Sequence, residues 1–368
     1  QDFESCVKHS LLVPLFLWSL CLGSPAELQA QGLSTGPLLS ATSEVKRAQV
    51  VIVQDNRATI DLMAQRRVIE EMLDWGMMRL AGTTNGPEAW RKYLSPKEVV
   101  GLKVYCAPGG GAGTRPAVVE AVINRLLNAG ISSSNIVVWD KHLAHLEQTG
   151  IAAVAARHQV SVAGAEDEGW DEKVFYETAL LGQLYFGDLE FQRKGEGVGR
   201  KSYVSKLLTH RLTKIINISP LLNHYKAGVT GNLFSLATGS VDNTRRFEDS
   251  ERMASAIPEI YALPEVGDKV VLNIVDALMC QYEGEMTSLL HYSLLLNQLR
   301  LSTDPVALDV LSVYELEKER TAAKISSPKL SMDLFHNASL LELGVSDEKN
   351  IQIENVPEAW VPAARASR

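Results

Sequence analysis

Cysteine is scarce in this chain, and two short motifs of metal and thiol chemistry are missing. The 368 residues include four cysteines, Cys6, Cys21, Cys106 and Cys280. Only Cys106 and Cys280 lie outside the first 30 residues, and two isolated cysteines are too few for a zinc knuckle or an iron–sulfur cluster. No His-Glu-x-x-His or Cys-x-x-Cys motif is present. The sequence therefore argues against an HExxH-type metalloprotease, a thiol-redox protein and an iron–sulfur carrier.

Positive charge is also in short supply. The formal net charge is −8, and the sequence contains no cluster of Lys and Arg that would form a basic patch. This balance argues against general nucleic-acid binding, because a duplex or single strand attracts proteins mainly through clustered positive charge. With 46% apolar residues, the chain can fill the core of one large or two modest domains.

The apolar run near the N-terminus is too short for a stop-transfer helix. It extends over Leu11–Gly23, follows Lys8 and His9, and fits the core of a signal peptide. We expect residues 1–30 to form a signal peptide cleaved near Ala30, with an uncleaved anchor as the alternative. The mature protein is then extracytoplasmic, periplasmic or secreted, without a stable membrane anchor, and begins with a flexible lead-in over residues 31–45.

Two cysteines remain after this cleavage. Cys106 and Cys280 both lie in apolar, strand-like runs. We expect two buried thiols, with a disulfide between them as the alternative in an oxidising compartment.

Continuous apolar runs alternate with helical periodicity along most of the chain. This alternation predicts an α/β fold with a mostly parallel sheet and helices on both faces. Strands are expected at 46–53, 99–108, 135–140, 213–219, 270–279, 294–302 and 350–355, and helices at 59–79, 115–128, 143–156 and 306–323.

The middle of the chain has a different pattern. Turn signals and short alternating segments at about 164–204 indicate a small antiparallel insertion. We therefore expect one α/β domain over residues 46–356 with this insertion, followed by a frayed tail at 357–368.

The glycine-rich loop after the second expected strand is the first candidate site. Thr114, a natural N-cap, and Pro116 open the following helix, so the loop is either a tight turn or a cradle for an anion at the helix N-terminus. It matches neither the nucleotide P-loop nor the dinucleotide fingerprint. The candidate ligand-binding residues here are Lys103, Gly109, Gly110, Gly111, Gly113, Thr114 and Arg115.

A second group of polar residues follows other strands. His224 in a glycine-rich polar segment is a candidate base or metal ligand, with surface or loop-stabilising histidine as the alternative. Asp304 is an N-cap candidate and a candidate catalytic carboxylate, whereas Thr230 and Asp276 are candidate ligand-binding residues. Asp140 likewise ends a strand. If these strand ends face one crevice, they form a polar site for a metal or a small charged substrate.

Several segments occur together in a familiar order. They are "GLKVYCAPGGGAGTRP", "IVVWD", "LLNHYKAGVTG", "LNIVDAL" and "STDPVALD". Together they resemble the family of domain of unknown function 362 (DUF362) over roughly Val99 to Glu317. The most specific segment is Asp304 to Asp309, followed by His224 with Gly228, Val229 and Thr230.

The chain departs from that family at several positions. Leu222 stands where a lysine commonly precedes the histidine, Cys106 replaces a strand asparagine, and Phe234 and Ser235 lie where a lysine and an asparagine are usual. Many relatives carry iron–sulfur cysteine motifs, but this chain has none, so that cofactor is not carried over.

These observations lead to one prediction and one alternative. We expect an exported α/β protein that binds a small anionic molecule or a metal ion at the carboxyl ends of its strands, with enzyme activity left open. The alternative is a non-catalytic binding or scaffold protein whose family pocket has degenerated.

Overall fold

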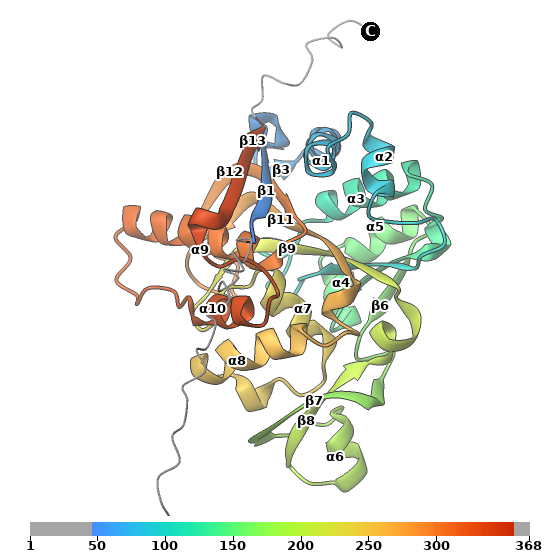
Figure 1. Cartoon of the computed structure of the whole chain (residues 1–368), viewed down its shortest axis with the longest axis vertical. Helices are drawn as coiled ribbons and strands as arrows, with labels where there is room; N and C mark the ends of the chain where they lie inside the picture. The colour runs from blue at the N-terminus through green and yellow to red at the C-terminus, as the bar shows by residue number, and fades with distance from the viewer. Residues whose placement is uncertain (1–45, 357–368) are drawn as a thin grey trace, which may run out of the picture. The chain divides into compact units, whose positions relative to one another are not determined.

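A nine-stranded sheet organises the protein (Figure 1). The computed structural model describes residues 46–356, so the predicted signal peptide, lead-in and tail lie outside the described range. The strand order is β13-β1-β12-β11-β9-β4-β5-β6, and β10 pairs with β9. The strands are β1 (Ala48–Gln54), β4 (Val100–Val104), β5 (Ile136–Asp140), β6 (Ser161–Gly164), β9 (Lys214–His224), β10 (Gly228–Val229), β11 (Val270–Gln281), β12 (Ser293–Ser302) and β13 (Ile351–Val356).

The sheet is mostly parallel, as the sequence predicts. Strands β6, β5, β4, β9 and β11 run in one direction, whereas β12 is antiparallel to both of its neighbours, β11 and β1. Every residue of β4 and β5 is buried. The carboxyl ends of the parallel strands therefore meet at one edge of the sheet, where such folds place their ligands.

Helices cover both faces of the sheet. Alternate residues of each strand point to opposite faces, so apolar strands contribute to a core on each face, and helices enclose both cores. Ile136 and Val138 pack in one apolar core and Val137 and Trp139 in the other. The first core includes residues of α1 (Arg66–Ala81), α2 (Gly86–Arg91), α3 (Pro116–Asn128), α4 (Leu143–Gln148) and α5 (Ile151–Arg157). The second includes α7 (Asn232–Ser240), α8 (Ser250–Tyr261), α9 (Pro305–Ala322) and α10 (Asp333–Leu340).

The predicted antiparallel insertion is confirmed. Strands β7 (Trp170–Gln183) and β8 (Val198–Ser205) pair antiparallel and are connected through α6 (Leu189–Lys194). Arg246 links this hairpin to the rest of the domain, because its guanidinium donates to the Tyr176 carbonyl at 2.9 Å and to Ser202 Oγ at 3.0 Å.

Two predicted helices differ from the structure. The helix expected from residue 59 begins only at Arg66, and a short hairpin of β2 (Thr59–Ile60) and β3 (Met63–Ala64) precedes it. Leu62 in this turn has φ of 65°, which a right-handed helix does not allow. The helix expected at 143–156 is divided into α4 and α5 at Gly150, where φ is 81°.

Several details bear on the sequence predictions. Cys106 and Cys280 are free and buried, which confirms two buried thiols rather than a disulfide. Strand β9 extends to His224, five residues beyond the predicted end at Ser219, so this histidine ends a strand instead of lying in a loop. Within residues 46–356, no helix combines the length and the apolar character needed to cross a membrane.

Candidate functional site

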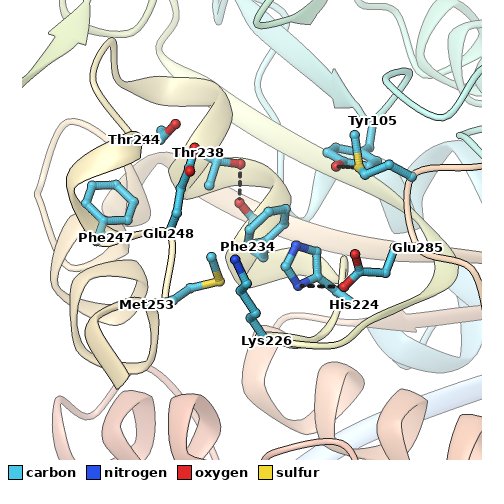
Figure 2. Close-up of a pocket in the computed structure, with 11 residues that line it drawn as sticks. Tyr105, His224, Lys226, Phe234, Thr238, Thr244, Phe247, Glu248, Met253 and Glu285 are labelled. Carbon is cyan, nitrogen blue, oxygen red and sulfur yellow. Dashed lines mark hydrogen bonds and ion pairs between the residues drawn. The ribbon is translucent and has the colours of Figure 1, made fainter. Parts of the chain in front are cut away.

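Three adjoining cavities lie at the carboxyl edge of the sheet, and we call them together the groove. The first has a volume of about 280 Å³ and is lined by residues that follow β4, β9 and β11 and by residues of α7 and α8 (Figure 2). Its walls are largely apolar, and are formed by Tyr105, Phe234, Phe247, Met253 and Met286. Its charged and polar lining includes His224, Lys226, Glu248 and Glu285.

His224 lies between an aromatic ring and a carboxylate in the first cavity. Its ring centroid is 4.4 Å from that of Phe234, and its Nδ1 is 4.0 Å from Glu285 Oε1. The residue is only 8% exposed. Burial, and secondarily the charge of Lys226, lowers the pKa of His224 to about 4, so the imidazole is neutral at pH 7.

One hydrogen bond assigns the tautomer of this neutral ring. The backbone N–H of Ala227 donates to His224 Nδ1 at 3.0 Å. Since Nδ1 accepts, it carries no hydrogen, and the proton of the neutral ring is on Nε2. His224 therefore presents an N–H donor to the cavity, and its Nδ1 bond to the turn after β9 fits the loop-stabilising alternative expected from the sequence.

The loop after β11 is bound to the end of β9. The backbone N–H of Tyr225 donates to Glu285 Oε1 at 2.5 Å, and the backbone N–H of Glu285 donates to Asn223 Oδ1 at 3.1 Å. These two bonds hold Glu285 beside His224 (Figure 2), and Met286, the next residue, also lines the cavity. No pattern in the sequence indicates this contact, because the two segments are about sixty residues apart.

The second and third cavities continue the groove along the ends of β4 and β5. The second, of about 280 Å³, shares Tyr105 and Phe234 with the first and extends to Asp140, Lys141 and His142. The third, of about 310 Å³, is lined by polar residues that include Lys141, Glu166, Asp188, Asn243 and Arg245. Thr244 lines all three cavities.

Lys103 lies beneath the groove and does not line it. The side chain is completely buried on β4, and its Nζ is 3.0 Å from Asp140 Oδ1. The other oxygen of Asp140 accepts the backbone N–H of Cys106 at 2.8 Å. Close packing with α7 requires Gly239, since a Cβ there would be 2.4 Å from Lys103 Cε. Lys103 and Asp140 thus form a buried ion pair that joins the ends of β4 and β5.

The glycine-rich loop folds as a closed turn. The N–H of Gly109 donates to the Cys106 carbonyl at 2.8 Å, and the N–H of Gly113 donates to the Gly109 carbonyl at 2.9 Å. Gly109 has φ of 80°, and a Cβ at Gly113 would be 2.8 Å from the Tyr105 carbonyl oxygen. Gly110 has open space around it. These contacts support the tight turn rather than the anion cradle.

Thr114 does not cap the helix that follows. The N-cap position belongs to Arg115, while Thr114 Oγ1 donates to the Ile218 carbonyl at 2.8 Å and accepts the N–H of Tyr105 at 3.0 Å. The N–H of Thr114 also donates to the Tyr105 carbonyl at 2.9 Å. Thr114 therefore fixes the backbone of Tyr105, whose ring lines the first and second cavities.

The anion position at the start of α3 is occupied by the protein itself. Asp276 is completely buried, and its carboxylate accepts the backbone N–H of Arg115 at 2.9 Å and the Arg115 guanidinium at 3.0 Å. A register shift between β11 and β9 occurs directly after Asp276. This carboxylate supplies the negative charge that a helix N-terminus favours, so an external anion is not needed there.

Two further predicted site residues have structural contacts away from the groove. Asp304 caps α9 by accepting the N–H of Ala307 at 2.9 Å, and its second oxygen accepts the N–H of Val345 at 2.9 Å. Thr230 is completely buried and donates to the Leu222 carbonyl at 3.1 Å. Neither residue lines any of the three cavities.

The sequence interpretation missed several residues of the groove. Tyr105 and Lys141 each follow a parallel strand directly, so the strand-end rule that selected Asp140 could have found them. Phe234 lies on α7, a helix that the sequence analysis did not predict. Among the described residues, no group of three or more His, Cys, Asp or Glu side chains is arranged to hold a metal ion.

Comparisons with known proteins identify a family. The family model described as "Domain of unknown function (DUF362)" matches residues 100–314, more than half of the chain. No curated protein matches the chain. A crystal structure of a protein from Thermotoga maritima is similar at 12% identity with a TM-score of 0.39, and the match covers 70% of this chain and 59% of that chain.

Proposed function

The chain belongs to the DUF362 family, and we propose that it binds a small ligand with an anionic oxygen and an apolar body in the first cavity of the groove. The hydrogen bond from the Ala227 N–H to His224 Nδ1 is the observation that carries this proposal, because it makes Nε2 a donor. Small-molecule sites commonly combine apolar walls with a few polar groups of this kind.

One ammonium in the first cavity can pair with a ligand anion beside His224, while the carboxylates of Glu248 and Glu285 also belong to the lining. The ammonium of Lys226 also lines the cavity, beside the imidazole (Figure 2). Its charge helps to keep His224 neutral, so the two side chains offer one ionic and one neutral donor. Glu285 lies on the other side of the ring and already accepts the Tyr225 N–H, which leaves the Lys226 side of the ring for the ligand oxygen.

The walls select the rest of the ligand. Phe234, Phe247 and Met253 present aromatic and thioether surface, and aromatic ligand rings pack well against such groups. We therefore favour binding over general-base catalysis at His224, since the Nδ1 lone pair of the imidazole is already used. A non-catalytic binding protein remains the second reading of the same geometry, and export by residues 1–30 remains a separate prediction.

Calorimetry with phenyl phosphate tests the proposal, because this probe combines an anionic oxygen with an aromatic ring. We expect phenyl phosphate to bind more tightly than inorganic phosphate or phenol. His224→Ala should weaken its binding by roughly tenfold or more, the value of one hydrogen bond to a charged group.

His336→Ala is the matched control, because His336 is exposed on α10 and lies outside the groove. It should leave the affinity for phenyl phosphate unchanged. Absence of phenyl phosphate binding, or equal affinity in His224→Ala and the wild type, would overturn the proposal.

A further inference from the structure

Two lysines flank Asp140, and only one of them reaches the groove. Lys103 is enclosed beneath it, whereas Lys141 is the first residue after β5, is partly exposed, and lines both the second and the third cavity. We propose that the Lys141 amine forms a reversible imine with aldehydes or ketones that enter the groove. This inference concerns a different residue and a different chemistry from the anion site at His224.

The contacts of Lys141 leave its amine available. Its Nζ donates to the backbone carbonyl of Asp242 at 2.7 Å. Among residues 46–356, no carboxylate oxygen lies within 4.0 Å of this Nζ, whereas Lys103 Nζ is 3.0 Å from Asp140. Lys103 is thus held as one half of an ion pair, and Lys141 is not.

The carboxylates around Lys141 are engaged elsewhere. Asp140, Glu166, Asp188 and Asp242 are the acidic groups that face it. Asp242 accepts the backbone N–H groups of Leu189, Tyr203 and Asn243; Asp188 accepts that of Tyr185; and Glu166 pairs with His142 at 2.6 Å. Burial lowers the pKa of Lys141 against the opposing pull of these charges. A lysine of this kind has more free amine at neutral pH than an exposed one.

Each of the two cavities that Lys141 lines also contains a residue with unpaired polar groups. Ser235 Oγ, in the lining of the second cavity, and both polar atoms of the Asn243 amide, in the lining of the third, have no hydrogen-bond partner within the described part of the chain. The two residues are 1% and 2% exposed. Unpaired buried polar groups are costly, so a ligand oxygen that pairs with one of them gains binding free energy.

The reaction needs no oxidant or reductant. The lone pair of the Lys141 amine attacks the carbonyl carbon and gives a carbinolamine. Loss of the hydroxyl as water, with the proton taken from the nitrogen, then gives the imine. His142 lines the same two cavities and pairs through Nδ1 with Glu166, so its Nε2 can carry that proton from nitrogen to hydroxyl.

Reductive trapping tests this inference on the full chain. The protein is incubated at pH 7 with 4-carboxybenzaldehyde or acetaldehyde and sodium cyanoborohydride, and the modified lysines are located by peptide mass spectrometry. We expect Lys141 to be modified about tenfold faster than the exposed Lys173 and Lys349, because burial favours its free amine over the ammonium ion. Lys141→Arg keeps the positive charge and the hydrogen-bond donor but removes the amine. The fast phase of modification should therefore be absent in this variant, and only the slow modification of the exposed lysines should remain.

The two probes separate this inference from the proposed function. Acetaldehyde has no anionic oxygen, so it should modify Lys141 equally in the wild type and in His224→Ala. Selective modification by acetaldehyde without phenyl phosphate binding would support the imine and refute the anion site. Modification of Lys141 no faster than that of Lys173 and Lys349 with both aldehydes would overturn the imine, whatever phenyl phosphate does.

Discussion

The start of α3 and the groove lie at the same edge of the sheet, yet their polar groups are used in opposite ways. At α3, the helix N-terminus and the Arg115 guanidinium are both bound by Asp276. In the groove, His224 Nε2, Ser235 Oγ and the Asn243 amide have no partner in the described structure. The comparison shows that a glycine loop before a helix predicts a favourable place for negative charge, which the protein can supply by itself.

The start of α3 and the groove are built from residues of different apolar cores, on opposite faces of the sheet. α3 packs in the core that contains Val118 and Val122, whereas Tyr105 and Phe234 belong to the core on the α7 side. The backbone of Tyr105 connects the two regions, because Thr114 holds it from the α3 side while its ring faces the groove. The glycine loop thus supports the groove without entering it.

Removal of the Asp276 carboxylate should have the largest effect. Asp276→Ala leaves a partly buried guanidinium and a helix N–H without their carboxylate partner, so we expect a loss of about 3 kcal/mol in the free energy of unfolding. Urea denaturation measures it. Asp249→Ala removes an exposed N-cap from α8 and should cost only about 1 kcal/mol. A loss below that of Asp249→Ala would show that the start of α3 does not depend on Asp276.

The low pKa of His224 should appear in the pH dependence of stability. The unfolded imidazole binds a proton near pH 6.5, but the folded one binds it only near pH 4, so the neutral ring stabilises the fold above pH 6.5. This contribution should be lost as the pH falls from 6.5 to 4, at a total of roughly 3 kcal/mol. His224→Asn, which does not titrate, should lose less stability over this range. Parallel wild-type and variant curves would contradict the pKa shift.

Two glycine substitutions should have the smallest effects and should separate stability from binding. A Cβ at Gly111 would be 2.1 Å from Ser288 Oγ and 3.2 Å from Ser288 Cβ, so Gly111→Ala should force the Ser288 side chain to rotate and weaken phenyl phosphate binding by a few-fold at most. Gly109→Ala has open space but φ of 80°, and should cost about 1 kcal/mol of stability without changing the affinity. Calorimetry measures the affinity for phenyl phosphate and urea denaturation measures the stability of both variants. Weaker phenyl phosphate binding in Gly109→Ala than in Gly111→Ala would contradict this prediction.

Much of the fold could be predicted because its signals are local. Apolar runs located β4, β5, β9 and β11, and Asp304 with Pro305 located the start of α9. The predicted start of the first helix at residue 59 was wrong, because a turn at Asp61 and Leu62 precedes the helix. Helix α7 was missed because its N-terminus is capped by Asp309, which accepts the N–H of Leu233 at 2.9 Å from far along the chain.

The site was harder to predict because it depends on pairings between distant segments. Residue type and position after a strand located His224 and Asp140 correctly at the carboxyl edge. They did not indicate that Asp276 would bind Arg115, or that Ala227 would use the Nδ1 lone pair of His224. Those contacts depend on the register of β11 and on the turn after β9, which no single segment determines.

Nitrogen NMR spectra of the histidine rings at pH 7 test the central claim most directly. The structure predicts that His224 is neutral with its proton on Nε2, and that phenyl phosphate shifts the Nε2 resonance while the exposed His336 does not respond. A proton on Nδ1, or an Nε2 resonance that is unchanged at saturating phenyl phosphate, would contradict the assignment of the first cavity as an anion-binding site.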